Sequence, residues 1–172
     1  MVFTLIGMPG CGKSCMGKAI CGKLKLKNID SDVLIEKKEG KKLCQLLEEL
    51  GLEGFKNLEE EVLLSFNEEN CILSTGGSAV YSDKAMRYLK SLGKVIYLKV
   101  SLDVLKQRLG DYSRRGIAFR PGQTLEDLYE ERTRLYEKYA DITVNCSGNA
   151  FPRYHAEIIS QIRKFLPENQ NS

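Results

Sequence analysis

Three glycines, a lysine and a serine lie close together near the start of the chain. Residues 7–14 read GMPGCGKS and match the pattern G-x-x-x-x-G-K-[ST]. Glycines let consecutive backbone N–H groups turn toward a phosphate, and the N-terminus of the helix that follows adds partial positive charge. Lys13 is expected to reach the β- and γ-phosphates, and the hydroxyl of Ser14 is expected to bind Mg²⁺. The sequence therefore predicts a site for a nucleoside triphosphate with its magnesium ion.

Two aspartates follow in the segment NIDSD, residues 28–32. They stand where a short predicted strand ends and the next helix begins. Asp30 is expected to support the metal or its waters near Ser14, and Asp32 is expected to accept a proton from a substrate hydroxyl. The alternative is a solvated junction in which Asp32 only caps the next helix.

A cluster of small residues ends the apolar segment ILSTGGSAV. Ligands of parallel α/β sheets bind at the carboxyl ends of strands, and this is where Ser74, Gly76, Gly77 and Ser78 are expected. No acid ends this strand, so support for the metal must come from Ser74 through a water molecule or from Asp30. The alternative is a tight turn that needs a positive φ, which explains one glycine more easily than two.

A polar segment, GDYSRRGIAFRPG, interrupts two predicted helices. Its composition, with Arg114, Arg115 and Arg120, is typical of a mobile lid that closes over phosphates and brings cations to the transferring group. Arg132 follows on the next helix. Solvated cations or pairing along the helix are the alternative, and we favour a functional role for Arg120 and Arg132.

Alternating strands and helices must position these residues. Apolar patterns, capping residues such as Ser82 and Thr124, and terminal glycines indicate where the elements begin and end. Strands are expected at residues 2–6, 27–30, 71–75, 94–100 and 141–146. Helices are expected at residues 13–24, 32–39, 44–50, 55–66, 82–92, 101–109 and 124–140, and from Pro152 onward. This alternation predicts an α/β fold, in which helices cover both faces of a parallel sheet.

Size and composition bound the class of protein. The 172 residues fit one domain, and the net charge of +3 suits an anionic small molecule better than a nucleic acid. No apolar stretch approaches the roughly 20 residues of a membrane span, and the start lacks the features of a secretory signal, so a cytoplasmic protein is expected. The six cysteines form no C-x-x-C pair and the chain has one histidine, so no zinc site is expected.

Taken in order, these motifs resemble the shikimate kinase family over nearly the whole chain. They are the phosphate loop, D-x-D, F-[basic]-x-x-E at residues 55–59, the glycine pair, a lid with R-P, and R-x-x-L-Y from Arg132. The resemblance implies a three-layer P-loop kinase fold similar to nucleoside monophosphate kinases, with a five-stranded parallel sheet in the order 2-3-1-4-5. It implies one domain over residues 1–172, a lid at about residues 111–123 and a substrate-binding helical segment at about residues 32–66. It also implies transfer of the γ-phosphate of ATP to the 3-hydroxyl of shikimate, in the route to aromatic amino acids.

The resemblance further implies roles for individual residues. Asp32 would hold the acceptor hydroxyls and act as the base, Arg132 would clasp the carboxylate, and Gly76 and Gly77 would touch the substrate. The metal would be supported by Ser14, Asp30 and Ser74. The residues implied for ATP are Gly10, Cys11, Gly12, Lys13, Ser14 and Cys15, with Arg120 at the γ-phosphate and Arg108 and Pro152 beside the adenine.

Three departures from the family pattern fall on the acceptor side. Lys56 stands where the motif F-R-x-x-E has an arginine for the carboxylate, so the charge is kept but the planar, two-pronged grip is lost. Ser78 replaces the third glycine and adds a hydroxyl near the substrate. The lid reads R-P-G-Q from Arg120 where the family has R-P-L-L, and the segment before it is longer. Lys56 and Ser78 are still expected to contact the substrate.

The sequence therefore predicts a monomeric kinase that depends on ATP and Mg²⁺, with shikimate as the favoured acceptor and no nucleic-acid or membrane partner. Two alternatives stay open. One is a kinase of another small hydroxy acid, a sugar acid or a nucleoside monophosphate. The other is a nucleotide-binding regulatory module without catalysis.

Overall fold

The apolar segments predicted as strands pair into one parallel sheet. The structure is a computed structural model that describes residues 1–109, 117, 119–120, 122–148 and 151–167. Within these residues five strands follow the order β2-β3-β1-β4-β5, which confirms the predicted order. The strands are β1 (Val2–Ile6), β2 (Lys27–Asp30), β3 (Cys71–Ser74), β4 (Gly93–Lys99) and β5 (Ile142–Asn145).

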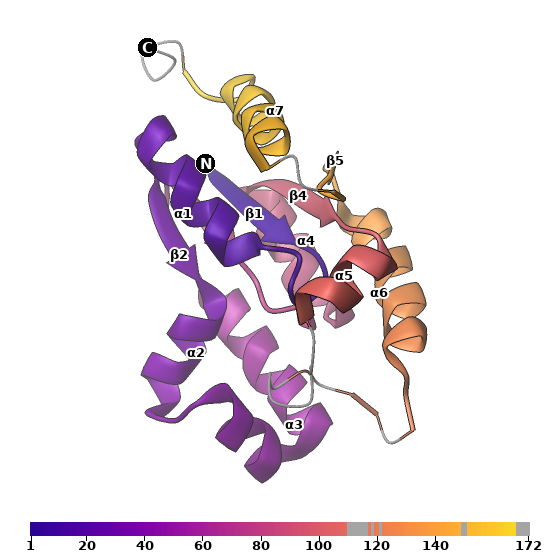
Figure 1. Cartoon of the computed structure of the whole chain (residues 1–172). Helices are drawn as coiled ribbons and strands as arrows, with labels where there is room; N and C mark the ends of the chain where they lie inside the picture. The colour runs from indigo at the N-terminus through magenta and orange to yellow at the C-terminus, as the bar shows by residue number, and fades with distance from the viewer. Residues whose placement is uncertain (110–116, 118, 121, 149–150, 168–172) are drawn as a thin grey trace.

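Helices cover both faces of this sheet and complete three layers (Figure 1). They are α1 (Lys13–Leu24), α2 (Ser31–Glu39), α3 (Leu43–Leu64), α4 (Asp83–Leu92), α5 (Leu102–Leu109), α6 (Leu125–Tyr139) and α7 (Phe151–Arg163). A short 3₁₀ turn, η1 (Ala79–Tyr81), follows β3. Helices α1 and α7 pack against each other on one face, and α4 and α6 pack against β4 on the other.

The central strands end level with one another. All five residues of β1 are buried, as expected for a strand covered on both faces. Leu5 of β1 and Asp30 of β2 both pair with Ser74 of β3. The loops that leave these three strands therefore open at the same edge of the sheet, the edge where ligands of such folds bind.

Local sequence signals place most helix ends. The hydroxyl oxygen of Ser82 accepts a hydrogen bond from Ala85 N at 2.9 Å, and that of Thr124 accepts one from Asp127 N at 3.1 Å, so both predicted caps are confirmed. The helices predicted at 44–50 and 55–66 form one element, α3. Its backbone leaves helical geometry at Gly51, where φ is 64° and ψ is −179°, so the predicted break is present as a kink.

Helices α2 and α3 have a small apolar cluster of their own, made of Ile35, Leu46, Phe55 and Val62. The main core instead surrounds the sheet. The two helices correspond to the expected substrate-binding segment, and in Figure 1 they extend below the sheet from the end of β2.

Most of the expected lid, including Arg114 and Arg115, lies outside the described residues, as do residues 168–172 of the predicted frayed tail. Ile117, Phe119, Arg120, Gly122 and Gln123 are the described residues of the lid range. No helix of the described ranges combines the length and the apolar character needed to cross a membrane.

Candidate active site

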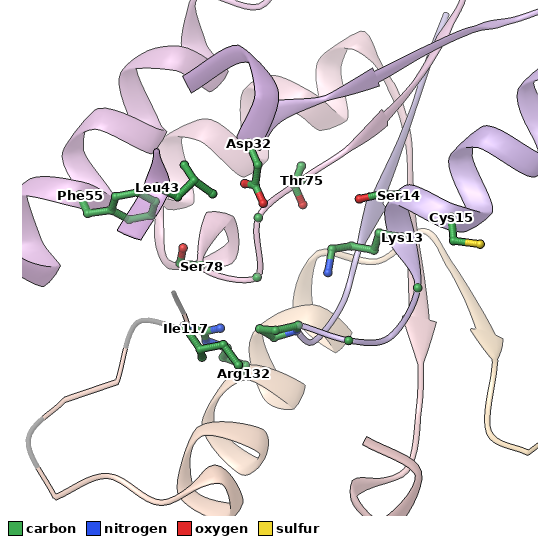
Figure 2. Close-up of a pocket in the computed structure, with 15 residues that line it drawn as sticks. Lys13, Ser14, Cys15, Asp32, Leu43, Phe55, Thr75, Ser78, Ile117 and Arg132 are labelled. Atoms are coloured by element: carbon green, nitrogen blue, oxygen red, sulfur yellow. The ribbon is translucent and has the colours of Figure 1, made fainter. Parts of the chain in front are cut away.

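A cavity of about 420 Å³ opens where β1 and β3 end (Figure 2). The glycine loop (residues 7–14) contributes Pro9, Gly10, Gly12, Lys13 and Ser14 to its lining. The other lining residues are Cys15, Asp32 of α2, Leu43 and Phe55 of α3, residues 75–78, Ile117, and Arg132 of α6. The predicted phosphate loop, aspartate, glycine pair and arginine, which lie far apart along the chain, therefore surround one space.

The glycine loop has the backbone that its sequence requires. Gly10 and Gly12 have φ of 79° and 100°, which side chains rarely adopt. A Cβ on Gly10 would also lie 2.7 Å from Leu109 Cδ2. Lys13 Nζ donates to Gly7 O at 2.8 Å and to Met8 O at 3.0 Å, so its buried ammonium is held over the loop. This arrangement brings backbone N–H groups, a helix N-terminus and a cation together, as binding of a polyphosphate requires.

The residues predicted for the metal lie next to this loop. Ser14 Oγ donates to Asp30 Oδ2 at 2.5 Å. Ser74 is 1% exposed, and its Oγ has no hydrogen-bond partner among the described residues. The described residues contain no group of three or more His, Cys, Asp or Glu side chains that could hold a metal. Mg²⁺ commonly takes one or two protein groups and completes its shell with phosphate and water oxygens. Ser14 and Asp30 fit that kind of site.

Asp30, and not Asp32, caps α2. Asp30 Oδ1 accepts a hydrogen bond from Asp32 N at 3.0 Å, so the alternative in which Asp32 is only a cap is wrong. The side chain of Asp32 points into the cavity instead (Figure 2). Burial raises the pKa of Asp32 to about 6, with a further increase from the charge of Asp30, while Lys13 acts in the opposite direction. Asp32 can therefore take up a proton near neutral pH.

Gly76 and Gly77 are glycines because a side chain at either position would collide with neighbouring atoms. Neither Gly76 nor Gly77 is among the residues with positive φ, so the alternative of a turn that needs positive φ is wrong. A Cβ on Gly76 would lie 3.0 Å from Asp32 Oδ1 and would collide with Glu59 Oε1. A Cβ on Gly77 would lie 2.8 Å from Pro9 Cδ and 2.9 Å from Arg132 Nη1. A side chain at either position would collide with other residues in the wall of the cavity.

Glu59, to which the sequence reasoning assigned no role, lies next to the cavity, against Gly76 and Ser78. It is 2% exposed, and its Oε2 accepts a hydrogen bond of 2.5 Å from Ser78 Oγ. Burial raises the pKa of Glu59 to about 7, against the effect of the hydrogen bond from Ser78. Helical spacing was the available signal, because Glu59 follows Phe55 by four residues and precedes Val62 by three, on the buried face of α3.

Arg132 is buried in the wall of the cavity, with 1% of its surface exposed. Its Nε donates to Tyr81 Oη at 3.3 Å. In Figure 2 it lies beside Ile117, across the cavity from Asp32. A buried guanidinium that lines a cavity is suited to bind the carboxylate of a ligand.

Two of the predicted cations lie outside the cavity. Lys56 Nζ pairs with Glu53 at 2.8 Å and stands 4.6 Å from the centre of the Tyr81 ring. Arg120, which is exposed, pairs with Glu131 of α6. Neither side chain lines the cavity.

The two residues predicted beside the adenine, Arg108 and Pro152, lie in different places. Arg108 of α5 donates to Cys11 O at 3.4 Å and to Cys146 O at 3.3 Å, so it braces the back of the glycine loop. Cys11 is buried behind the loop and does not line the cavity. Pro152, in the first turn of α7, lines a different cavity together with Lys23 of α1. The structure therefore does not bring Pro152 to the glycine loop.

Known proteins similar to this chain are shikimate kinases. A family model described as shikimate kinase matches residues 9–166. A shikimate kinase from Sulfurihydrogenibium sp. (strain YO3AOP1) is 34% identical over 161 residues, which are 93% of this chain and 96% of that protein.

Solved structures agree. The crystal structure of a shikimate kinase from Aquifex aeolicus is similar with a TM-score of 0.81 and 31% identity, covering 95% of this chain and 96% of that one. A shikimate kinase from Acinetobacter baumannii in complex with shikimate is similar with a TM-score of 0.84 and 29% identity, covering 95% and 93%. Each similarity extends over nearly the whole chain.

Proposed function

The chain belongs to the shikimate kinase family, and we propose that the cavity at its glycine loop is the site of that family's reaction. The protein transfers the γ-phosphate of ATP to a hydroxyl group of shikimate. One observation carries the assignment of the reaction to this cavity: Lys13, Asp32 and Arg132 come from three different elements and line the same space. They supply a cation for phosphate, a base for a hydroxyl and a cation for a carboxylate.

On the donor side, backbone N–H groups of residues 10–15 would surround the phosphates of ATP. Lys13 would exchange its bonds to Gly7 O and Met8 O for oxygens of the β- and γ-phosphates. Arg108, which donates to Cys11 O of the loop, would flank the base of the nucleotide. Arg120 would leave Glu131 and reach the γ-phosphate as the lid closes. Pro152 is left out of this proposal because it faces α1.

On the acceptor side, Arg132 would bind the carboxylate of shikimate, and residues 76–78 would form the floor beneath it. Asp32 would then hold the reacting hydroxyl and accept its proton while the oxygen attacks the γ-phosphate in line. The pKa of Asp32, about 6, keeps the carboxylate mostly ionised at neutral pH and still basic enough for this role.

We propose Mg²⁺ as the metal, held next to the glycine loop by Ser14, with Asp30 and Ser74 acting through water. When bound, the ion neutralises charge on the β- and γ-phosphates. The unpartnered, buried hydroxyl of Ser74 supports this assignment, since a metal-bound water would satisfy it.

We also propose that residues 1–172 act as one kinase domain and as a cytoplasmic monomer, on small molecules only. The family model covers most of the chain, and the elements of a single chain enclose the cavity. A net charge of +3 is compatible with anionic metabolites and is small for a nucleic-acid or membrane-surface protein.

A substrate panel tests the acceptor. ADP release is followed with ATP, Mg²⁺ and one acceptor at a time: shikimate, gluconate or a nucleoside monophosphate. We expect ADP release when shikimate is the acceptor and none with the other acceptors. Each mole of ADP should be matched by one mole of a phosphate ester of shikimate. Turnover of another acceptor with none for shikimate would contradict the proposed substrate.

A variant tests the donor site. Lys13→Met should reduce kcat by at least about 10³-fold, since it removes a cation from the transferring phosphate. Its melting temperature should stay close to that of the wild type. The matched control is Lys18→Met, on the exposed face of the same helix, which should keep full activity. Unchanged turnover in Lys13→Met would refute the role of this lysine.

A further inference from the structure

Tyr81 stands behind the arginine of the proposed carboxylate site. It ends η1, the 3₁₀ turn that follows the glycine pair, and η1 packs against α6. Its hydroxyl oxygen accepts the hydrogen bond from Arg132 Nε at 3.3 Å, and its ring centre lies 5.3 Å from the guanidinium carbon of Arg132. One side chain therefore contacts this guanidinium twice, through a hydrogen bond to Nε and through its ring.

These contacts decide how Arg132 can present itself. A guanidinium binds a carboxylate best when two N–H groups meet the two oxygens in one plane, so its orientation matters as much as its charge. Nε is the donor closest to the backbone of the arginine, and fixing it to Tyr81 limits rotation of the whole group. Arg132 Nη1 meanwhile lies against Gly77, at the floor of the cavity. The donors beyond Nε are thereby held at the substrate side.

Burial raises the pKa of Tyr81 and so favours the protonated hydroxyl, while the charge of Arg132 acts in the opposite direction. The carboxyl group of Glu131, the neighbour of Arg132 on α6, also raises this pKa. Glu131 itself pairs with Arg120.

The same ring also accounts for the position of Lys56. Its ammonium lies 4.6 Å from the centre of the Tyr81 ring and pairs with Glu53 at 2.8 Å. A cation over the face of a tyrosine is stabilised by the negative potential of the ring. Lys56 therefore shares the Tyr81 ring with Arg132 and does not line the cavity itself.

We propose that Tyr81 is a specificity-determining positioning residue: it orients Arg132 toward the carboxylate of the acceptor and holds Lys56 outside the cavity. This inference rests on the proposed function and adds to it the residue that sets selectivity for an acid. It assigns the carboxylate to Arg132, with Lys56 as a more distant charge.

The test compares shikimate with its analogue in which hydroxymethyl replaces the carboxylate. Tyr81→Phe removes the hydroxyl and keeps the ring. We expect the KM for shikimate to rise roughly tenfold, the effect of losing a hydrogen bond to a charged group. The kcat, the KM for ATP and the KM for the hydroxymethyl analogue should stay within about twofold of the wild type. Tyr88→Phe, whose hydroxyl bonds only Phe66 O among the described contacts, is the matched control and should change none of them.

The outcomes separate clearly. An unchanged KM for shikimate in Tyr81→Phe would overturn the proposal, and so would an equal loss for shikimate and the hydroxymethyl analogue, since that pattern means general damage to the cavity. Wild-type enzyme that does not phosphorylate shikimate at all would instead refute the proposed function.

A second variant decides the matter if Tyr81→Phe does not fold. Lys56→Met alters a partly exposed side chain and removes its charge. We expect its KM for shikimate to rise no more than about threefold, as for a distant charge in a screened position. A rise of tenfold or more would mean that Lys56 itself grips the carboxylate, and would overturn the proposal.

Discussion

The carboxyl group of Asp32 owes its basicity to its surroundings. Burial raises the pKa of this carboxyl group, and the nearby charge of Asp30 raises it further. Lys13 opposes both, and the resulting pKa of about 6 leaves the group ionised at neutral pH. A base with a pKa just below the working pH combines the correct protonation state with useful proton affinity.

This pKa predicts the pH dependence of activity. Because Asp32 must be ionised to accept the proton, kcat/KM for shikimate should rise with pH through about 6 and then level off. Glu59 titrates nearby, at about 7, so the observed limb reports both carboxyl groups. Asp32→Asn should lower kcat by about 10² to 10⁴-fold and leave the KM for ATP within about twofold.

Steady-state kinetics between about pH 5 and pH 9 measure both effects. Asp103→Asn, an exposed change on α5, is the control and should follow the wild-type profile. Equal losses in kcat and in affinity for ATP would show that Asp32 has a structural role.

At the scale of elements, the turn from β1 to α1 organises the donor site. Three glycines with positive φ, at positions 7, 10 and 12, bend the chain so that it enters α1 directly after the loop. Gly12 immediately precedes α1, with φ of 100° and ψ of 18°. The direction of the loop N–H groups therefore depends on backbone conformation, and a side chain at Gly12 would meet nothing within 4 Å.

The variant Gly12→Ala tests the effect of backbone conformation without a steric collision, because an added Cβ meets nothing there. Gly40, which follows α2 with φ of 66°, is the matched control, because a Cβ added there would also meet nothing within 4 Å. Both alanine variants should lose about 1 kcal/mol of unfolding free energy, the cost of a left-handed alanine. Only Gly12→Ala should also raise the KM for ATP, by about tenfold, because strain there turns loop N–H groups away from the phosphates.

Chemical denaturation and steady-state kinetics on the two variants provide the comparison. Gly12→Ala that binds ATP as well as Gly40→Ala would contradict the importance of the loop conformation.

At the scale of the whole molecule, Glu59 connects the pair of helices α2 and α3 to the loop that follows strand β3. Its carboxyl reaches from α3 to Ser78, and its Oε1 faces Gly76. Folding raises its pKa from 4.5 to about 7, so the native state holds a proton that the unfolded chain releases. Asp32 changes in the same direction, from 3.8 to about 6. Both groups therefore make the fold less stable as the pH rises from about 4 to 7.

Glu59→Gln should reduce this dependence. Glutamine cannot ionise, and its side-chain oxygen can still accept the bond from Ser78, so the unfolding free energy should fall less steeply between about pH 5 and pH 8. Urea denaturation at several pH values measures the slope. Glu61→Gln, an exposed change on the same helix, should keep the wild-type slope. Identical slopes in Glu59→Gln and wild type would refute the buried, proton-binding state of Glu59.

Sequence reasoning recovered the elements and the conformation of the glycine loop. The strand order, the caps at Ser82 and Thr124 and the kink at Gly51 agree with the structure. Lys13, Ser14 and Asp32 line the predicted cavity. Lys56, Arg120 and Pro152, predicted to contact the ligands, lie outside the cavity. The contacts of Glu59 with Ser78 and of Tyr81 with Arg132 were not predicted.

There is a physical reason why some features could be predicted from the sequence and others could not. By itself, the sequence determined whatever depends on neighbouring residues: the left-handed glycines of the loop, the helix caps, and the apolar periods that make strands and helices. Only the tertiary structure decided which side chains meet across the fold. Arg132 and Tyr81 are 51 residues apart, and Ser78 and Glu59 are 19 apart. Burial and pairing at such distances arise from packing, and they set the pKa of Asp32 and the orientation of Arg132.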